Sequence, residues 1–312
     1  MFFALQVFIS KNPDILQIVF MKKKYILVCN QINTNKKKLK SIKKLEDLIR
    51  REHFIEVFYS NSLEDAERIY GNFKNKKFDY LIVVGGDGSF NFAINKIIKY
   101  NLEDKILGYI PSGTANILRY EANIPEKADY ILNFLTLSKV KKINLVQINE
   151  NYFFLMAGIG FDAKIVASIN TKIKKYLGKI IFFLKGLQHF LFLKNNKIEV
   201  EINSEKIMAD WVLCTNSKYY AGPYSIANET NIFEGKLVTY IFKDLTRLNL
   251  LYYVWLVLTK GDLASAKGVI KKDLDKLKIV GFNNKLLYQI DGEDCGYHNL
   301  IEIRKSEKSI NL

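Results

Sequence analysis

A cluster of three glycines at the end of an apolar run constrains this 312-residue chain more than any other feature. Tyr80–Val84 is a continuous apolar run typical of a buried strand, and Phe90–Tyr100 has the apolar spacing of a helix. Gly85, Gly86 and Gly88 lie between them. Glycines at such a turn let backbone N–H groups approach a phosphate closely, and the start of the following helix favours negative charge. The sequence therefore predicts a strand–turn–helix unit with a candidate phosphate site.

The rest of the first half repeats this alternation of strands and helices. The expected strands are Tyr25–Cys29, Phe54–Tyr59, Tyr80–Val84 and Leu107–Ile110, and the expected helices are Lys37–His53, Leu63–Phe73, Phe90–Tyr100 and Thr114–Glu121. Such an order is typical of βαβ units, so we expect a parallel sheet with helices on its faces, a Rossmann-like α/β domain.

The second half contains mostly strand patterns, several of which alternate apolar and polar residues, so an antiparallel sheet or sandwich is expected. The expected strands are Lys142–Ile148, Tyr152–Ala157, Lys197–Ile202, Glu205–Cys214, Leu237–Phe242, Lys278–Phe282, Leu286–Ile290 and Leu300–Ile303. Two helical stretches, Ala163–Leu193 and Thr246–Ile270, interrupt them. We therefore expect an α/β domain over residues 21–140 and a β-sandwich over 141–312, whose last strand can return to the first domain. Residues 1–20 form an extension ahead of the start at Met21, and the sequence leaves open whether they are translated.

Composition narrows the class of protein. The formal net charge of +15 suggests an anionic partner or ligand, although lysines spread along the whole chain also fit a simple solvated surface. The three cysteines are far apart, which argues against disulfides and zinc and favours a reduced, cytoplasmic protein. The three histidines form no metal-binding spacing. No apolar run is long enough for a transmembrane helix, and a signal peptide is not expected.

Asp87 stands inside the glycine cluster, where an acidic group would repel a phosphate unless Mg²⁺ lies between them. An alternative that stays open is a plain strand-to-helix turn in which Asp87 caps a helix. The cluster matches neither the P-loop pattern nor the dinucleotide pattern. A second small-residue loop, Ser112–Asn116, follows the next strand, and two such loops lie together at the carboxyl edge of a parallel sheet. Far along the chain, Asp291, Glu293 and Asp294 surround Gly292, which is either an exposed acidic turn or the source of a general base.

In this order and spacing, the motifs resemble those of the bacterial diacylglycerol kinase-like lipid kinases. They are Gly-Gly-Asp-Gly-Ser-Phe-Asn from Gly85, Pro-Ser-Gly-Thr-Ala-Asn from Pro111, Met-Ala-Gly-Ile-Gly-Phe-Asp-Ala from Met156, and Asp-Gly-Glu from Asp291. The resemblance implies a nucleotide-binding α/β domain, a C-terminal β-sandwich, an active site in the cleft between them, and transfer of phosphate from ATP to a lipid hydroxyl.

The resemblance also implies roles for individual residues. The implied catalytic residues are Glu293, Asp87 and Asp291. Glu293 is the implied general base, and Asp87 bears on Mg²⁺-ATP as an implied metal-binding residue. Glu234 stands at the acidic position of a second, structural Mg²⁺ site. The implied nucleotide-binding residues are Asn30, Ser60, Gly85, Gly86, Asp87, Gly88, Ser89, Asn91, Gly113, Thr114 and Asn116.

Three positions depart from the family pattern. Ile117 and Asn144 stand where relatives often carry aspartate, and Phe92 stands where they commonly carry glutamate. Two of these changes remove acidic groups that support Mg²⁺ through water in relatives. Three hypotheses therefore stay open: a lipid kinase, a related kinase with a soluble substrate such as an NAD kinase, and a non-catalytic nucleotide- or lipid-binding relative.

The expected partners are ATP and a lipid at a membrane surface, with no nucleic acid. Two helical stretches, Tyr176–Leu193 and Leu250–Leu258, are apolar and aromatic, and basic residues lie within or shortly before them. They either lie on a membrane surface or cover the sandwich core. The sequence does not identify the acceptor lipid, and a homodimer is left open.

Overall fold

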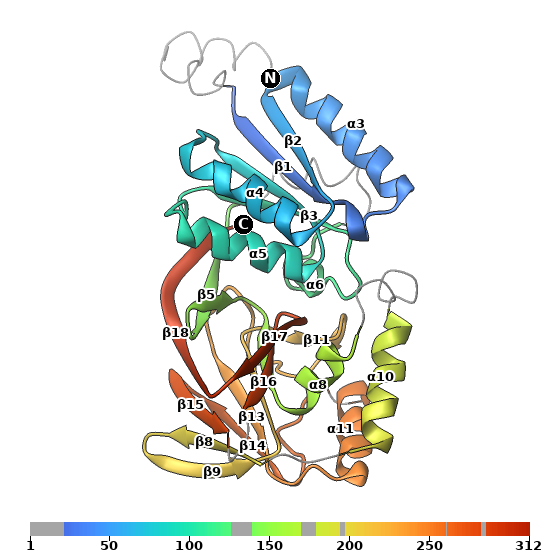
Figure 1. Cartoon of the computed structure of the whole chain (residues 1–312), viewed down its shortest axis with the longest axis vertical. Coiled ribbons are helices and arrows are strands. Elements are labelled where there is room, and N and C mark those ends of the chain that lie inside the picture. The colour runs from blue at the N-terminus through green and yellow to red at the C-terminus, as the bar shows by residue number, and fades with distance from the viewer. Residues whose placement is uncertain (1–21, 126–138, 170–178, 194–196, 260, 282–284) are drawn as a thin grey trace, which may run out of the picture.

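The computed structural model describes residues 22–125, 139–169, 179–193, 197–259, 261–281 and 285–312 (Figure 1). The expected extension over residues 1–20 lies outside these ranges. The molecule has two parts along its long axis, an α/β part at one end and a strand-rich part at the other.

Four parallel strands form the centre of the N-terminal part, in the order β2-β1-β3-β4. The strands are β1 (Lys24–Asn30), β2 (Phe54–Ser60), β3 (Tyr80–Gly85) and β4 (Ile106–Pro111). The helices are α3 (Lys36–Glu52), α4 (Leu63–Gly71), α5 (Asp87–Lys99) and α6 (Ile117–Glu121), with 3₁₀ turns η1 (Gln31–Asn33) and η2 (Asn72–Asn75). All four expected strands and all four expected helices are present, and the expected parallel pairing is confirmed.

Strand β1 shows why the sheet is covered on both faces. Leu27 and Cys29 pack in one apolar cluster with Ile42 and Leu45 of α3, and the intervening Val28 packs in another cluster with α4 and α5. Side chains alternate between the faces of a strand, so a strand buried on both sides must be continuously apolar.

The C-terminal part is a sandwich of two sheets. One sheet continues the N-terminal strands into β18 (Leu300–Asn311), β15 (Lys276–Gly281), β8 (Ile198–Ile202) and β9 (Glu205–Ala209), with β5 (Lys142–Ile148) and β6 (Asn151–Phe153) beside β18. The other, antiparallel sheet has the order β14 (Val269–Asp273), β13 (Val238–Phe242), β10 (Trp211–Thr215), β7 (Met156–Ile159), β16 (Leu286–Ile290) and β17 (Glu293–His298). A short hairpin, β11 (Tyr219–Tyr220) and β12 (Tyr224–Ser225), stands apart.

Strand β18 joins the two parts of the molecule. It pairs antiparallel with β5 and β15, and its Asn311 pairs in parallel with Ile106 of β4. Figure 1 shows it as the long red strand that runs from the sandwich to the N-terminal sheet. The last strand of the chain thus completes the sheet on which the glycine loops lie, whereas the domain boundary near residue 140 stays a prediction.

Helices cover the outer face of the antiparallel sheet: α8 (Phe161–Ala167), α10 (Lys179–Leu191) and α11 (Arg247–Thr259) (Figure 1). The expectation of one helix over Thr246–Ile270 is wrong, because Ile270 pairs with Ile241 in a strand. In the stretch 163–193, α8 ends at Ala167, and residues 170–178 lie outside the described ranges. Lys271 and Lys272 interrupt the apolar pattern of 269–273, so sequence alone gave little sign of β14.

Candidate active site

The two glycine loops touch each other at the carboxyl edge of the parallel strands. Gly85 ends β3, Gly86 stands between β3 and α5, and Gly113 follows β4. The Ser112 N–H donates to the Gly85 carbonyl at 2.7 Å. A Cβ atom placed on Gly113 would lie only 2.4 Å from the Gly86 Cα, so only glycine permits this approach. The structure thus brings the two loops together, as expected for neighbouring strands of an open α/β sheet.

Polar residues from β1 and β2 lie at the same edge. Asn30 ends β1 and donates from Nδ2 to Ser89 Oγ at 3.0 Å, on the first turn of α5. Thr34 forms a hydrogen bond with Ser112 at 3.0 Å, which ties the first strand to the second glycine loop. Ser60 ends β2 opposite Asn30 in the parallel register. Asn30, Ser60 and Ser89 are therefore neighbours of the loops, although their part in nucleotide binding stays a prediction.

The carboxylate of Asp87 fixes one loop to the other. Its Oδ2 accepts from the Ile117 N–H at 2.9 Å, and its Oδ1 accepts from the Leu118 N–H at 3.1 Å. Asp87 is the first residue of α5, yet its side chain caps the start of α6, and it is 7% exposed. A charge at this end of a helix is favourable. Gly86, and not Asp87, stands at the cap position of α5, so the Asp87 carboxylate caps the neighbouring helix instead of its own.

Asn116 shapes the second loop from within. Its backbone has φ +50°, and its side-chain oxygen accepts from the Gly113 N–H at 2.9 Å while its amide donates to the Gly113 carbonyl at 2.9 Å. Thr114 lies between them and is half-buried. The Asn116 amide is thus engaged by its own loop, which leaves backbone groups and Thr114 as the groups of this loop best placed for a ligand.

Glu293 reaches the first loop from the other part of the molecule. It begins β17, and its Cγ and Oε1 would lie 2.4 Å and 2.6 Å from a Cβ atom placed on Gly88. The residue is exposed, so solvent or a substrate can reach its carboxylate. A side chain about two hundred residues distant in sequence thus lies directly on the glycine turn.

Asp291 has a different environment, although it is only two residues away. It is 6% exposed, and its carboxylate accepts from the N–H groups of Phe154, Leu155 and Met156 at 2.8–3.2 Å and from the Asn91 amide at 2.7 Å. Burial raises its pKa to about 7, and the nearby charge of Asp87 acts in the same direction, while the three backbone donors oppose it. With its oxygens occupied, Asp291 holds the turn that carries Glu293 rather than facing a substrate.

The amide of Asn91 is turned toward this support. It donates to Asp291 and also to the Tyr152 carbonyl at 2.9 Å. Asn95, one helical turn later, donates to the same carbonyl at 3.0 Å. Helix α5 is thereby fixed to the strand-rich part below the glycine turn, and the predicted contact of Asn91 with nucleotide would require its side chain to leave these partners.

A buried aspartate that sequence reasoning left without a role supports the same turn. Asp162 is 3% exposed and accepts from Trp211 Nε1 at 2.9 Å and from the Gln289 amide at 3.1 Å. The Gln289 oxygen in turn accepts from the Gly292 N–H at 2.8 Å. Gly158, which has no space for a side chain against Asp162, belongs to the motif that starts at Met156. The motif from Met156 was the sequence feature that pointed to Asp162. Its spacing could not show that Asp162 supports a turn 130 residues later in the chain.

Substitution of Asp162 should remove a pH dependence of stability. Burial raises its pKa to about 6, above the ordinary value of 3.8. Between these values the folded protein retains a proton that the unfolded chain releases, so the free energy of unfolding falls as pH rises from about 4 to about 6. We expect the wild type to lose roughly 3 kcal/mol more than Asp162→Asn over this window. Urea unfolding at pH 4 and pH 7 measures the difference, and parallel slopes for both proteins would contradict it.

The acidic groups fit the two implied metals unequally. Mg²⁺ in kinases is held mainly by substrate phosphates with one or two carboxylates, so Asp87 and Glu293 beside the loops suffice without an all-protein cage. At the second implied site, Glu234 is exposed and accepts from the Asn231 amide at 2.6 Å. The Asn144 amide donates to the Phe233 carbonyl at 2.7 Å. Among the described residues, no cluster of three acidic, histidine or cysteine side chains stands here or elsewhere.

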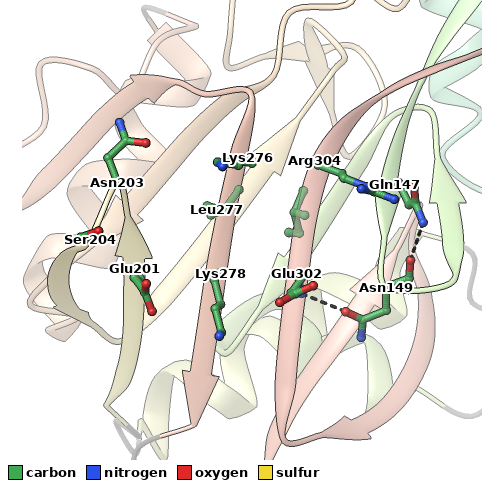
Figure 2. Close-up of a pocket in the computed structure, with 11 residues that line it drawn as sticks. Gln147, Asn149, Glu201, Asn203, Ser204, Lys276, Leu277, Lys278, Glu302 and Arg304 are labelled. Atoms are coloured by element: carbon green, nitrogen blue, oxygen red, sulfur yellow. Dashed lines mark hydrogen bonds between the residues drawn. The ribbon is translucent and has the colours of Figure 1, made fainter.

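A hollow of about 500 Å³ lies elsewhere, on the outer face of the long sheet (Figure 2). Its polar walls include Lys276 and Lys278 of β15 and Glu302 and Arg304 of β18, and the intervening Leu277 and Ile303 belong to the apolar core of the sandwich. Lysines, glutamates and an arginine are mixed there, with Asn149 bonded to the Glu302 N–H and Arg304 to Gln147. This pattern is typical of the solvent face of a sheet, and we assign it no chemistry.

Part of the chain matches a known protein family. Residues 24–148 match the model of the diacylglycerol kinase catalytic domain, so this segment is similar to that domain. This confirms the resemblance drawn from the four motifs, and the matched region contains both glycine loops.

Similar proteins extend the match beyond this domain. The chain is 26% identical to a diacylglycerol kinase of Bacillus subtilis over 71% of this chain and 73% of that protein. It is 28% identical to a Yersinia pestis protein named "Probable lipid kinase YegS-like", over 77% and 80%. A crystal structure described as a diacylglycerol kinase from Bacillus anthracis has the same fold, with a TM-score of 0.73, 20% identity, and coverage of 93% and 97%. The expected architecture of an α/β part and a β-sandwich is thus confirmed.

Proposed function

We propose that the chain is an ATP-dependent lipid kinase that transfers the γ-phosphate of ATP to the hydroxyl of diacylglycerol or a related lipid. The observation that carries the proposal is the position of Glu293 against Gly88. A proton acceptor from one part of the molecule lies on the phosphate-type turn of the other part, which is the arrangement that phosphoryl transfer to a hydroxyl requires.

The chain's own residues supply three parts of the reaction. The first-turn N–H groups of α5 and the two glycine loops offer donors for the ATP phosphates. Glu293 accepts the proton of the lipid hydroxyl. The oxygen of that hydroxyl forms a bond to the γ-phosphorus while the bond between the γ-phosphorus and the ADP oxygen breaks. Asp87 and Asp291 keep the two loops and the Glu293 turn in register.

Mg²⁺ bound with ATP would neutralise the negative charge that develops on the phosphate, and Asp87 and Glu293, which lie at the glycine loops, are the acidic residues that would help to hold it. The family pattern has further acidic positions, which are Ile117 and Asn144 here. Ile117 is buried, and its N–H binds Asp87, so its backbone already contributes to the loop. We infer that the metal is held chiefly by the nucleotide.

A lipid acceptor is proposed because similar proteins are named lipid kinases and because the chain has the Asp-Gly-Glu turn from Asp291. Relatives are named diacylglycerol kinase or lipid kinase, and these names do not select one lipid for this chain. A lipid acceptor lies in a bilayer, so we expect peripheral contact with a membrane. Among the helices that the structure describes, none is long and apolar enough to span one.

Purified protein with Mg²⁺ and γ-labelled ATP tests the function. We expect label in the organic phase when diacylglycerol or phosphatidylglycerol is offered in mixed micelles, and none without Mg²⁺. Transfer to NAD or to a sugar phosphate instead would support a soluble-substrate kinase. ATP binding without transfer to any acceptor would refute catalysis and favour a binding protein.

A further inference from the structure

Two neighbouring helices of the sandwich expose ten large apolar side chains. We call this set the α10–α11 face. Its members are between 40% and 79% exposed: Leu184, Leu187, Leu191, Phe192, Leu248, Leu251, Tyr252, Val254, Trp255 and Leu258. The helices contact each other, and Figure 1 shows them side by side along one flank of the sandwich. A soluble monomer rarely exposes an apolar surface of this kind without a partner.

Helix α11 is apolar on every side, yet only one side is covered. Leu250, Tyr253 and Leu256 are buried, and Tyr253 packs against Phe242 of the antiparallel sheet. From Leu248 to Thr259 the helix contains no charged residue. A helix lying on a protein surface normally presents polar residues outward, whereas one that is apolar all round is buried. The outward side of α11 therefore fits an apolar environment better than water.

The two helices themselves carry charge of one sign. Neither α10 nor α11 contains an aspartate or glutamate, while Lys185 lies in α10 and Arg247 begins α11. Arg247 donates to the Leu191 carbonyl at 2.7 Å, so its positive charge lies where the two helices meet. Basic residues beside an apolar helical face favour the anionic headgroups of a bilayer.

Aromatic residues and the position of the face indicate the same partner. Tyr252 and Trp255 are exposed and stacked, with ring centres 5.8 Å apart, and such amphipathic rings favour the headgroup level of a bilayer. Helix α8 contacts both α10 and β17, and β17 begins with Glu293. The face is thus one helix away from the strand that bears the proposed base.

We propose that the α10–α11 face is the surface by which this protein docks on an anionic lipid bilayer. The inference rests on the proposed function, since a lipid acceptor gives the protein a reason to bind a bilayer. A second copy of the chain would bring the basic residues of two such faces together, which is unfavourable, whereas an anionic membrane neutralises them.

The two tryptophans of the chain provide a direct test. Trp211 is buried against Phe242, while Trp255 is 50% exposed on the face. With vesicles of phosphatidylglycerol and phosphatidylcholine and no ATP, we expect a blue shift of the emission and quenching by brominated lipid. Trp255→Phe should lose this signal yet still sediment with the vesicles. An unchanged spectrum in the wild type would overturn the proposal.

Sedimentation of variants measures the contribution of the face. The double variant Leu251→Ser and Leu258→Ser should bind the same vesicles about a hundredfold more weakly, because each exposed leucine contributes about tenfold on insertion. Leu63→Ser is the matched control, since Leu63 is 63% exposed on α4 of the other part and should leave binding unchanged. Equal melting temperatures show that both variants fold.

Two outcomes would count against the face as a bilayer contact. Equal binding of the double variant and the wild type would place the contact elsewhere. A dimer that the double variant abolishes, without vesicle binding by the wild type, would make the face an interface between copies.

Kinase activity on a short-chain diacylglycerol dissolved as monomers separates the proposed membrane surface from the proposed function. The double variant should retain this activity, whereas vesicle binding without activity on any acceptor would refute the function and leave the surface standing.

Discussion

Glu293→Gln should lower the rate of phosphoryl transfer by about 10²–10⁴-fold while ATP binding is retained, because the amide cannot accept the proton of the lipid hydroxyl. The substitution keeps the size of the side chain, so its contact with Gly88 is preserved. Single-turnover measurement with labelled ATP reports the chemical step, and nucleotide titration in the absence of acceptor reports binding. The loss should appear in kcat and kcat/KM alike, as expected for a group that acts in the transition state.

The matched control is Glu302→Gln, which makes the same change on the exposed outer face of the long sheet. Its activity should equal that of the wild type. A Glu293→Gln enzyme with more than about a tenth of wild-type activity would exclude Glu293 as the general base. A parallel loss of ATP affinity would instead indicate that Glu293 holds the glycine turn.

The N-terminal part was predictable because its strands and helices follow from short-range patterns in the sequence. Tyr25–Cys29 and Tyr80–Val84 are short, continuous apolar runs, and the serine directly before the expected helix from Leu63 is a residue type that caps helices. Ser62 does so, accepting from the Asp65 N–H at 3.1 Å. Parallel strands place their carboxyl ends at one edge, so the meeting of the Gly86 and Gly113 loops also followed from strand order.

The C-terminal part was less predictable because its strands depend on partners distant in sequence. Strand β7 (Met156–Ile159), for example, pairs with β10 and with β16, both far along the chain. Strand β17 (Glu293–His298) pairs with its hairpin neighbour β16 but has few apolar residues, so no apolar pattern indicated it. The expected strand Glu205–Cys214 is divided at Asp210, whose buried carboxylate accepts from Lys197 and from the Leu245 N–H. Such bonds join segments tens of residues apart, and no periodicity in the sequence records them.

At the candidate site, the sequence indicates which residue types are present, whereas their contacts appear only in the structure. The sequence indicates Asp87 and Asp291 as candidate site residues, and in the structure the oxygens of both accept backbone N–H groups. A motif indicates that a carboxylate is required, whereas only the fold shows whether it faces a ligand or a helix end. Glu121 is similar: it is buried, accepts from the Lys218 N–H at 2.6 Å, and has a pKa raised by burial. It fixes α6, and with it the second loop, to the strand-rich part.

Gly113→Ala should reduce catalysis by about a hundredfold. The added methyl group would lie 2.4 Å from the Gly86 Cα, and backbone atoms cannot turn aside as a side chain can. The two loops must separate by about 1 Å to reach ordinary contact, and a displacement of that size in a phosphate site can cost about 10²-fold. Stability should fall by about 1–3 kcal/mol, as for other overpacked positions.

Gly71→Ala provides the comparison, because a methyl group there would meet only the Tyr100 hydroxyl at 3.9 Å, an ordinary contact. Steady-state kinetics with urea unfolding on both variants separates the two effects. Gly113→Ala should show a raised KM for ATP and a lowered kcat at a temperature where it is fully folded, while Gly71→Ala should match the wild type. Full activity of Gly113→Ala would mean that phosphate binding does not depend on the contact between the loops, and the proposed nucleotide site would then have to lie elsewhere.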